Sequence, residues 1–176
     1  MKERHNNIIP ECYADTVLVE ILGFSYPNHS PLNNVSHVLR TIKGKRPKEK
    51  VVGIIDSDRG RSEKYLKKDK LLRHFNLVGE EEGIKKYTFE NQTILILYPA
   101  FEGWIFDNAD QNGLDTSKYG FPTSKEFKKA CKDVEAKNND RLKQFLNALK
   151  QKNASGFLQL KSWICEGIGV NEDDIQ

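Results

Sequence analysis

The stretch that most constrains this fold is residues 51–55, Val-Val-Gly-Ile-Ile. A strand with one solvated face would alternate apolar and polar residues. This continuous, mostly β-branched run instead predicts a strand that is buried on both faces, as in a parallel sheet covered by helices. The run leads directly into Asp56-Ser57-Asp58. Because binding sites of α/β sheets form at the carboxyl ends of the strands, these residues mark one edge of the sheet as a candidate site.

The remaining pattern predicts an α/β fold with a largely parallel central sheet and a helical C-terminal region. A second buried strand is expected over residues 94–98, a weak one over 8–9, and a hairpin or adjacent strands over 87–89 and 93–98. Helices are expected over residues 15–24, 33–42, 63–75, from 101 onward, 124–133, 140–152 and 157–167. We expect one domain, residues 1–176, with the motifs in 1–107 and a helical extension, 108–176, that packs on the core.

Composition excludes several classes of protein. No apolar run approaches the roughly 20 residues that span a bilayer, and the N-terminus lacks the apolar region of a secretory signal, so we expect a cytoplasmic protein with no membrane partner. The cysteines, Cys12, Cys131 and Cys165, show no CxxC pattern, and the histidines show no metal-binding spacing. The sequence therefore predicts neither a disulfide framework nor a zinc site.

Two acidic pairs are the candidates for chemistry. Asp56 and Asp58 repel each other where a buried strand ends, and a hard, oxygen-preferring ion such as Mg²⁺ or Mn²⁺ would relieve that repulsion. Glu11 and Asp15 lie one helical turn apart after the first expected strand. Each pair alone also suits turn formation or helix capping, with Asp15 as the cap. Together, four acids at two strand ends favour two-metal phosphodiester chemistry.

Basic residues are dense over residues 40–73, although the net charge is only +3. Such a run is often only a solvated surface, but it could also guide a polyanion to the acids. Arg59, Arg61 and Lys64 follow the second acidic pair directly and are the candidate phosphate contacts. The alternative for the two arginines is a salt bridge to nearby acids.

Three segments resemble motifs of Toprim domains, in particular OLD-type nucleases and small standalone Toprim-like proteins of phage defence and mobile elements. Residues 11–15, Glu-Cys-Tyr-Ala-Asp, resemble the E-x-x-x-D element, Asp56-Ser57-Asp58 resemble the DxD element, and residues 98–104 resemble a P-x-x-E-x-W element. Cys12 departs from the glycine that is usual after the first glutamate.

The resemblance implies a Toprim-like fold and a Mg²⁺- or Mn²⁺-dependent nuclease, with DNA rather than RNA as the expected substrate. It implies that Glu11, Asp56 and Asp58 are catalytic and that Glu11, Asp15, Asp56, Asp58 and Glu102 bind metal. An ATPase partner protein would suit the OLD-type likeness, and a homodimer is a further option. We expect Trp104 to pack its helix onto the sheet.

Two other functions fit the same residues. A HAD-like phosphatase or phosphotransferase also places a DxD after an apolar strand and would use Asp56 as its nucleophile, although no DxDGT occurs here. A non-catalytic module that binds nucleic acid or a protein partner would keep the fold without turnover.

Overall fold

Five strands form one mixed sheet in the computed structural model, which describes residues 5–25, 27, 34–45, 48–58, 60–70 and 72–175. The strands are β1 (Ile8–Pro10), β2 (Val51–Asp56), β3 (Asn76–Glu81), β4 (Ile84–Phe89) and β5 (Gln92–Leu97). Their spatial order is β1-β2-β5-β4-β3. β1, β2 and β5 are parallel, whereas β4 and β3 join as antiparallel neighbours. The predicted α/β class with a parallel centre is confirmed, and the sheet as a whole is mixed.

The central strands have the predicted burial. Residues 51–55 of β2 and all of β5 are buried, which explains why their sequences are continuously apolar. β4 and β5 form the expected hairpin. β3 was not predicted, because an exposed edge strand with the sequence Asn-Leu-Val-Gly-Glu-Glu carries no hydrophobic period. β1 lies at the opposite edge, where Pro10 is tolerated.

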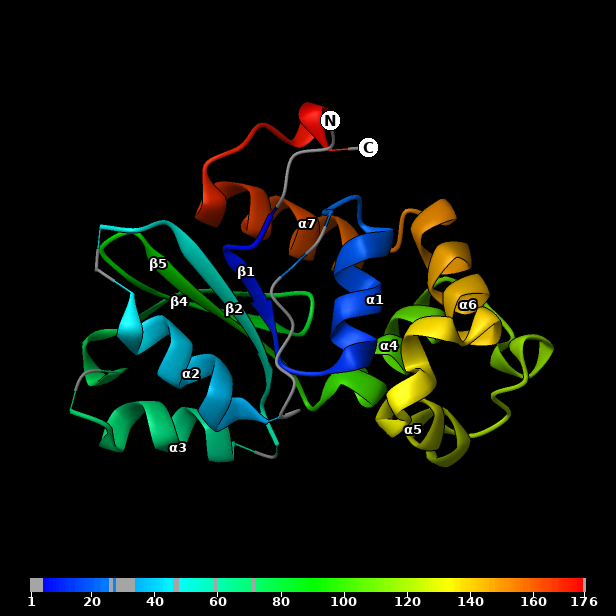
Figure 1. The fold of residues 1–176 in the computed structure, drawn as a ribbon. Helices are drawn as coiled ribbons and strands as arrows, with labels where there is room; N and C mark the ends of the chain where they lie inside the picture. Colours follow the sequence, from blue (N-terminus) through cyan, green and yellow to red (C-terminus); the bar gives the residue numbers. More distant parts are fainter. Residues whose placement is uncertain are drawn as a thin grey trace.

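Helices cover both faces of the sheet (Figure 1). The helices are α1 (Tyr13–Ile21), α2 (Val35–Gly44), α3 (Arg61–Lys68), α4 (Phe101–Gln111), α5 (Ser124–Lys132), α6 (Asp140–Gln151) and α7 (Ser155–Ile168). Short 3-10 turns are η1 (Leu72–His74), η2 (Thr116–Tyr119), η3 (Val134–Asn138) and η4 (Glu172–Asp174). The helix expected over 63–75 is interrupted because Asp69 leaves the helical conformation and its Oδ1 accepts from the N–H of Leu72, which starts η1.

Alternation along β2 divides the interior into two layers. Val52 and Ile54 face the larger cluster, which contains α1, α4, α5, α6 and α7, whereas Val51 and Ile55 face the smaller one beneath α2 and α3. Side chains from the C-terminal region, among them Phe145, Leu146, Phe157, Leu160 and Ile164, belong to the larger cluster. The C-terminal helices therefore complete the core around the sheet.

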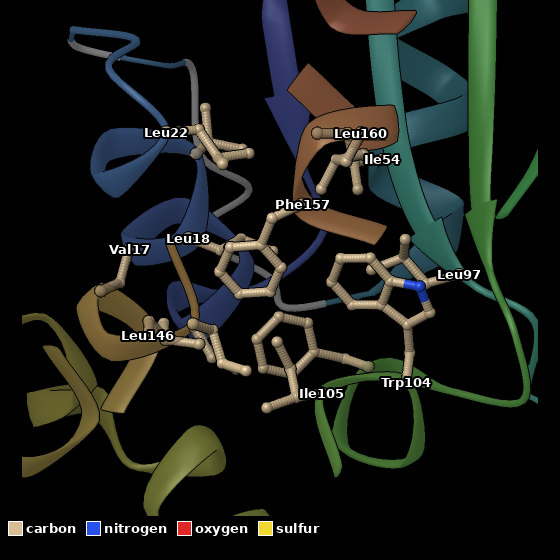
Figure 2. Packing of buried hydrophobic residues seen from close by; sticks show 14 of the residues in the cluster. Val17, Leu18, Leu22, Ile54, Leu97, Trp104, Ile105, Leu146, Phe157 and Leu160 are labelled. Carbon is tan, nitrogen blue, oxygen red and sulfur yellow. The ribbon is translucent and has the colours of Figure 1, made fainter. Parts of the chain in front are cut away.

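Trp104 joins α4 to this core as expected. Its ring stacks on that of Phe157 with centroids 5.6 Å apart, and Trp104 lies between Phe157 and Leu97 of β5 (Figure 2). Its Nε1 donates to the carbonyl of Glu82 at 2.8 Å, so the buried indole N–H has a partner. In the described part of the chain, no helix has the length and apolarity needed to cross a membrane.

Candidate functional site

The parallel pairing of β1 and β2 brings the two acidic pairs together. Pro10 lies opposite Ile54, so the chain leaves both strands at the same edge of the sheet. Glu11 follows there, and its Oε2 accepts a hydrogen bond from the backbone N–H of Asp56 at 2.9 Å. Residues that are 45 positions apart in the sequence thus share one short contact.

Asp15 enters the same region from the first turn of α1. The N-cap of α1 is Cys12, so Asp15 takes part in capping this helix, which the sequence left open as an alternative, but from position N3 and not as the N-cap. Asp15 instead completes a capping box: its Oδ2 accepts from the N–H of Cys12 at 3.0 Å, while Cys12 Sγ accepts from the N–H of Asp15 at 3.4 Å. Asp15 is 1% exposed, and its Oδ1 has no hydrogen-bond partner among the described residues. Burying an oxygen without a partner is costly, so this atom is available to a ligand.

The beginning of α4 is the third element of the site. Ala100 caps this helix without a side-chain hydrogen bond, and Asp56 supplies one in its place, because its Oδ1 accepts from the N–H of Phe101 at 2.9 Å. Glu102 lies in the same first helical turn. The partial positive charge of a helix N-terminus stabilises acidic groups at this position. We call Glu11, Asp15, Asp56, Asp58 and Glu102 the acid cluster.

Mutual repulsion and burial raise the pKa of the acid cluster's interior carboxyls. Burial, with further contributions from Asp58 and Glu102, raises the pKa of Glu11 to about 6 against the opposing hydrogen bond from Asp56. Burial, Glu11 and Glu102 raise the pKa of Asp56 to about 8, although the Phe101 N–H and Lys128 oppose the rise. Burial and the charges of Asp56 and Glu11 also raise the pKa of Asp15. A cation bound here would relieve this shared repulsion.

Asp58 lies on the outer side of the acid cluster. Its backbone has a φ of 43°, and Gly60 follows with a φ of 85°, so the chain turns sharply into α3. The buried hydroxyl of Ser57 fixes this turn by accepting from the N–H of Gly60 at 3.0 Å and donating to Glu63. The side chain of Asp58 is 57% exposed. It can therefore change rotamer at little cost.

The predicted phosphate contacts have mixed outcomes. Arg61 forms a 3.2 Å salt bridge with Asp58, which is the alternative that the sequence left open, and Lys64 is exposed on α3. Arg59 lies outside the described residues. Much of the basic stretch lies elsewhere: Lys48 and Lys50 precede β2, so they lie near the end of that strand opposite Asp56.

The donors of the acid cluster suit a hard divalent ion, because they are carboxylate oxygens and one buried oxygen has no partner. As the side chains stand, no three or more His, Cys, Asp or Glu side chains within the described ranges converge closely enough to hold an ion. One oxygen each of Glu11, Asp15 and Asp56 is engaged by a backbone N–H. Holding an ion therefore requires side chains of the acid cluster to move, and Asp58, which is exposed, and Glu102, which is half-buried, are the candidates to do so.

Sequence reasoning missed one cation beside the acid cluster. Lys128 of α5 favours the ionised form of Asp56, although 72 positions separate the two residues in the sequence. The spacing of the lysines at 125, 128, 129 and 132 was the available signal, because it places all of them on one side of a helix.

Comparisons of this chain with known proteins gave no match: no family model, no curated protein and no solved structure is significantly similar to it.

Proposed function

We propose that this protein hydrolyses phosphodiester bonds of nucleic acid, with Mg²⁺ or Mn²⁺ held by the acid cluster. The observation that carries the proposal is the contact between Glu11 and Asp56, which unites acids from two parallel strand ends in a site where burial and neighbouring carboxylates raise the pKa values of both. Acids with raised pKa values are common at functional sites, because catalysis and ligand binding require pKa values that burial and nearby charges adjust.

Each acid has a distinct role in this proposal. Asp15 and Asp56, both fixed by backbone N–H groups, would supply rigid ligand oxygens. Glu11, whose pKa is raised to about 6, would bind the ion and also accept the proton of the attacking water. Asp58 and Glu102, which can reorient, would complete the ligand set. Bound Mg²⁺ or Mn²⁺ supplies charge stabilisation for the departing oxygen and lowers the pKa of water.

The test is a cleavage assay on single-stranded and duplex DNA and RNA, with Mg²⁺, with Mn²⁺ and with EDTA. The proposal expects metal-dependent cleavage by the wild type, preferentially of DNA, and its loss in Asp56→Asn. Asp110→Asn is the matched control, because Asp110 is exposed near the end of α4. Equal cleavage by wild type and Asp56→Asn would remove Asp56 from the reaction.

A non-catalytic nucleic-acid-binding module is the second candidate, and one observation favours it. The buried acids all accept hydrogen bonds from backbone N–H groups, so they already have a structural role in joining β1, β2, α1 and α4. This function predicts DNA binding that is unaffected by Mn²⁺ and no heat of Mn²⁺ binding in calorimetry. A micromolar or tighter Mn²⁺ site that is lost in Asp56→Asn would exclude it.

The HAD-like reaction remains a third option with a sharp test. It requires a covalent phospho-aspartate at Asp56, and a phosphate mimic such as beryllium fluoride would trap its analogue. Absence of a beryllium fluoride adduct, together with cleavage of DNA, would leave hydrolysis by metal-activated water.

A further inference from the structure

The outer side of α5 carries four lysines: Lys125, Lys128, Lys129 and Lys132. Their spacing of three, four and seven residues places them on one side of the helix, and all are exposed. Phe127 and Cys131, on the opposite side, are buried. Among the described residues, none of these lysines forms a salt bridge. We call these four residues the lysine face.

Packing fixes α5 beside the acid cluster, and Lys128 is the member of the lysine face whose charge acts on Asp56. The ring of Phe127 stacks on that of Phe101 with centroids 6.1 Å apart and 11° between their planes. Phe101 is the residue whose N–H donates to Asp56. After burial, the charges of Glu102, Asp15 and Asp56 raise the pKa of the Cys131 thiol, so the inner side of α5 faces the acids. Figure 1 shows α5 next to the beginnings of α1 and α4, which carry Asp15 and Glu102.

The surface over the lysine face is hollowed. The hollow has a volume of about 620 Å³ and is lined by the four lysines with Thr123 and Glu126. The carboxylate of Glu126 accepts from the hydroxyl of Thr123 at 2.9 Å, which completes the cap of α5. The lining of the hollow is mainly apolar, as the aliphatic stems of lysines are, and each of the four stems ends in an ammonium group.

The chemistry of this surface suits a chain of phosphates. Like charges at this spacing repel one another, and a polyanion converts that repulsion into attraction. From Lys125 to Lys132 the helix rises roughly 10 Å, about three nucleotide steps along one strand of a duplex. Since α5 exposes no aromatic side chain, it offers no platform for base stacking, and lysines act as point charges without base specificity.

We propose that the lysine face binds the phosphate backbone of the nucleic acid, independently of base sequence, and places it against the acid cluster. The proposal rests on the proposed function, because the acids alone would repel a polyanion. It assigns nucleic-acid binding to α5 rather than to residues 40–73, where the sequence has its highest density of basic residues.

The test is DNA binding by the full chain in EDTA, measured by fluorescence anisotropy between about 50 and 200 mM salt. The variant replaces Lys125, Lys128, Lys129 and Lys132 with glutamine, which retains helix propensity. We expect at least a 10-fold loss of affinity, as an order of magnitude, and a slope of log K against log salt that is less negative by roughly 3. A second variant with arginine at the same positions keeps the charge and is expected to bind like the wild type.

The matched control replaces Lys118, Lys137, Lys143 and Lys152, which lie outside α5, with glutamine and removes the same charge. Its affinity is expected to fall by less than about 3-fold, because only the long-range field changes. Equal losses in both glutamine variants would overturn the proposal. Unchanged DNA binding with lost binding of polyglutamate would overturn it in favour of an acidic protein partner.

The same samples separate this proposal from the proposed function. Lysine-dependent binding without cleavage in Mg²⁺ or Mn²⁺ would overturn hydrolysis and support the lysine face. Cleavage by the wild type with unchanged binding by the glutamine variant would overturn the lysine face and leave hydrolysis in place.

Discussion

The carboxylate of Glu11 accepts a hydrogen bond from the backbone N–H of Asp56 at 2.9 Å, while its negative charge raises the pKa of the Asp56 carboxyl. Attraction to the backbone and repulsion between the carboxylates therefore act across the same strand ends. The hydrogen bond holds the two acids at short range when no cation is present. A substitution that removes the negative charge but keeps the acceptor oxygen therefore separates the effect of charge from that of hydrogen bonding.

Glu11→Gln keeps an oxygen that can accept from the N–H of Asp56 but removes the negative charge. We expect the affinity for Mn²⁺ to fall at least about 10-fold in calorimetry, because a carboxylate is lost from the ligand set. We also expect the free energy of unfolding in EDTA to stay within about 1 kcal/mol of the wild-type value or to rise. Glu20→Gln, at an exposed position of α1, is the control and should bind Mn²⁺ normally. A normal Mn²⁺ affinity in Glu11→Gln would contradict the assignment of Glu11.

Asp56→Asn is expected to change activity and stability in opposite directions. Loss of a residue that only orients a metal ligand lowers metal affinity or activity about 10–100-fold. Loss of a ligand itself should therefore lower the rate of cleavage at least about 100-fold. The asparagine Oδ1 can still accept from the N–H of Phe101, and the free-energy cost of keeping the Asp56 carboxyl protonated in the folded protein at pH 7 is removed. The unfolding free energy in EDTA at pH 7 should therefore rise by a few kcal/mol, as an order of magnitude. A lower melting temperature in Asp56→Asn would show that the ionised group stabilises the fold.

The raised pKa of Asp56 predicts an unusual dependence of stability on pH. The folded protein takes up a proton near pH 8, whereas the unfolded chain does so only near pH 4, so folding is favoured as the pH falls through this range. From pH 8 to pH 6 without metal, we expect a gain of about 2 kcal/mol in unfolding free energy. Glu11 extends the gain below pH 6. Denaturant titrations in EDTA measure it, and saturating Mn²⁺ should weaken or reverse the trend, because the ion binds the ionised form.

The sequence was sufficient to predict β2, β5 and most helices, because their hydrophobic periods are long and uninterrupted. It could not predict β3, whose exposed residues are held by backbone pairing with β4 rather than by burial. The proximity of Glu11 to Asp56 could be expected, because both follow parallel strands. The function of Asp15 as a partner of Cys12 could not, because a cysteine N-cap is rare among capping residues.

The position of α5 shows a second limit of the sequence. Lys128 reaches the acid cluster only because Phe127 packs on Phe101, and that contact depends on how two distant helices pack. The density of basic residues along the sequence instead favoured residues 40–73 as the segment that guides a polyanion. Charge patterns along a chain thus indicate a class of partner, whereas tertiary packing decides which charges border the site.

Gly53 tests how closely α2 packs on β2, the strand that ends at Asp56. A Cβ at Gly53 would clash with Cδ1 of Ile42 and lie 2.9 Å from Cγ1 of Val38, so Gly53→Ala requires these side chains or α2 itself to shift. We expect a loss of about 1–3 kcal/mol in unfolding free energy. Because Asp56 ends the same strand, Mn²⁺ affinity should fall as well.

Gly44→Ala is the matched control, since a Cβ at the last residue of α2 would meet no atom within 4 Å. Alanine favours the helix over glycine by up to about 1 kcal/mol, so this variant should be as stable as the wild type or more stable. Denaturant unfolding and Mn²⁺ calorimetry on both variants complete the comparison. Equal stability and equal Mn²⁺ affinity in Gly53→Ala and Gly44→Ala would contradict the close packing of α2 on β2.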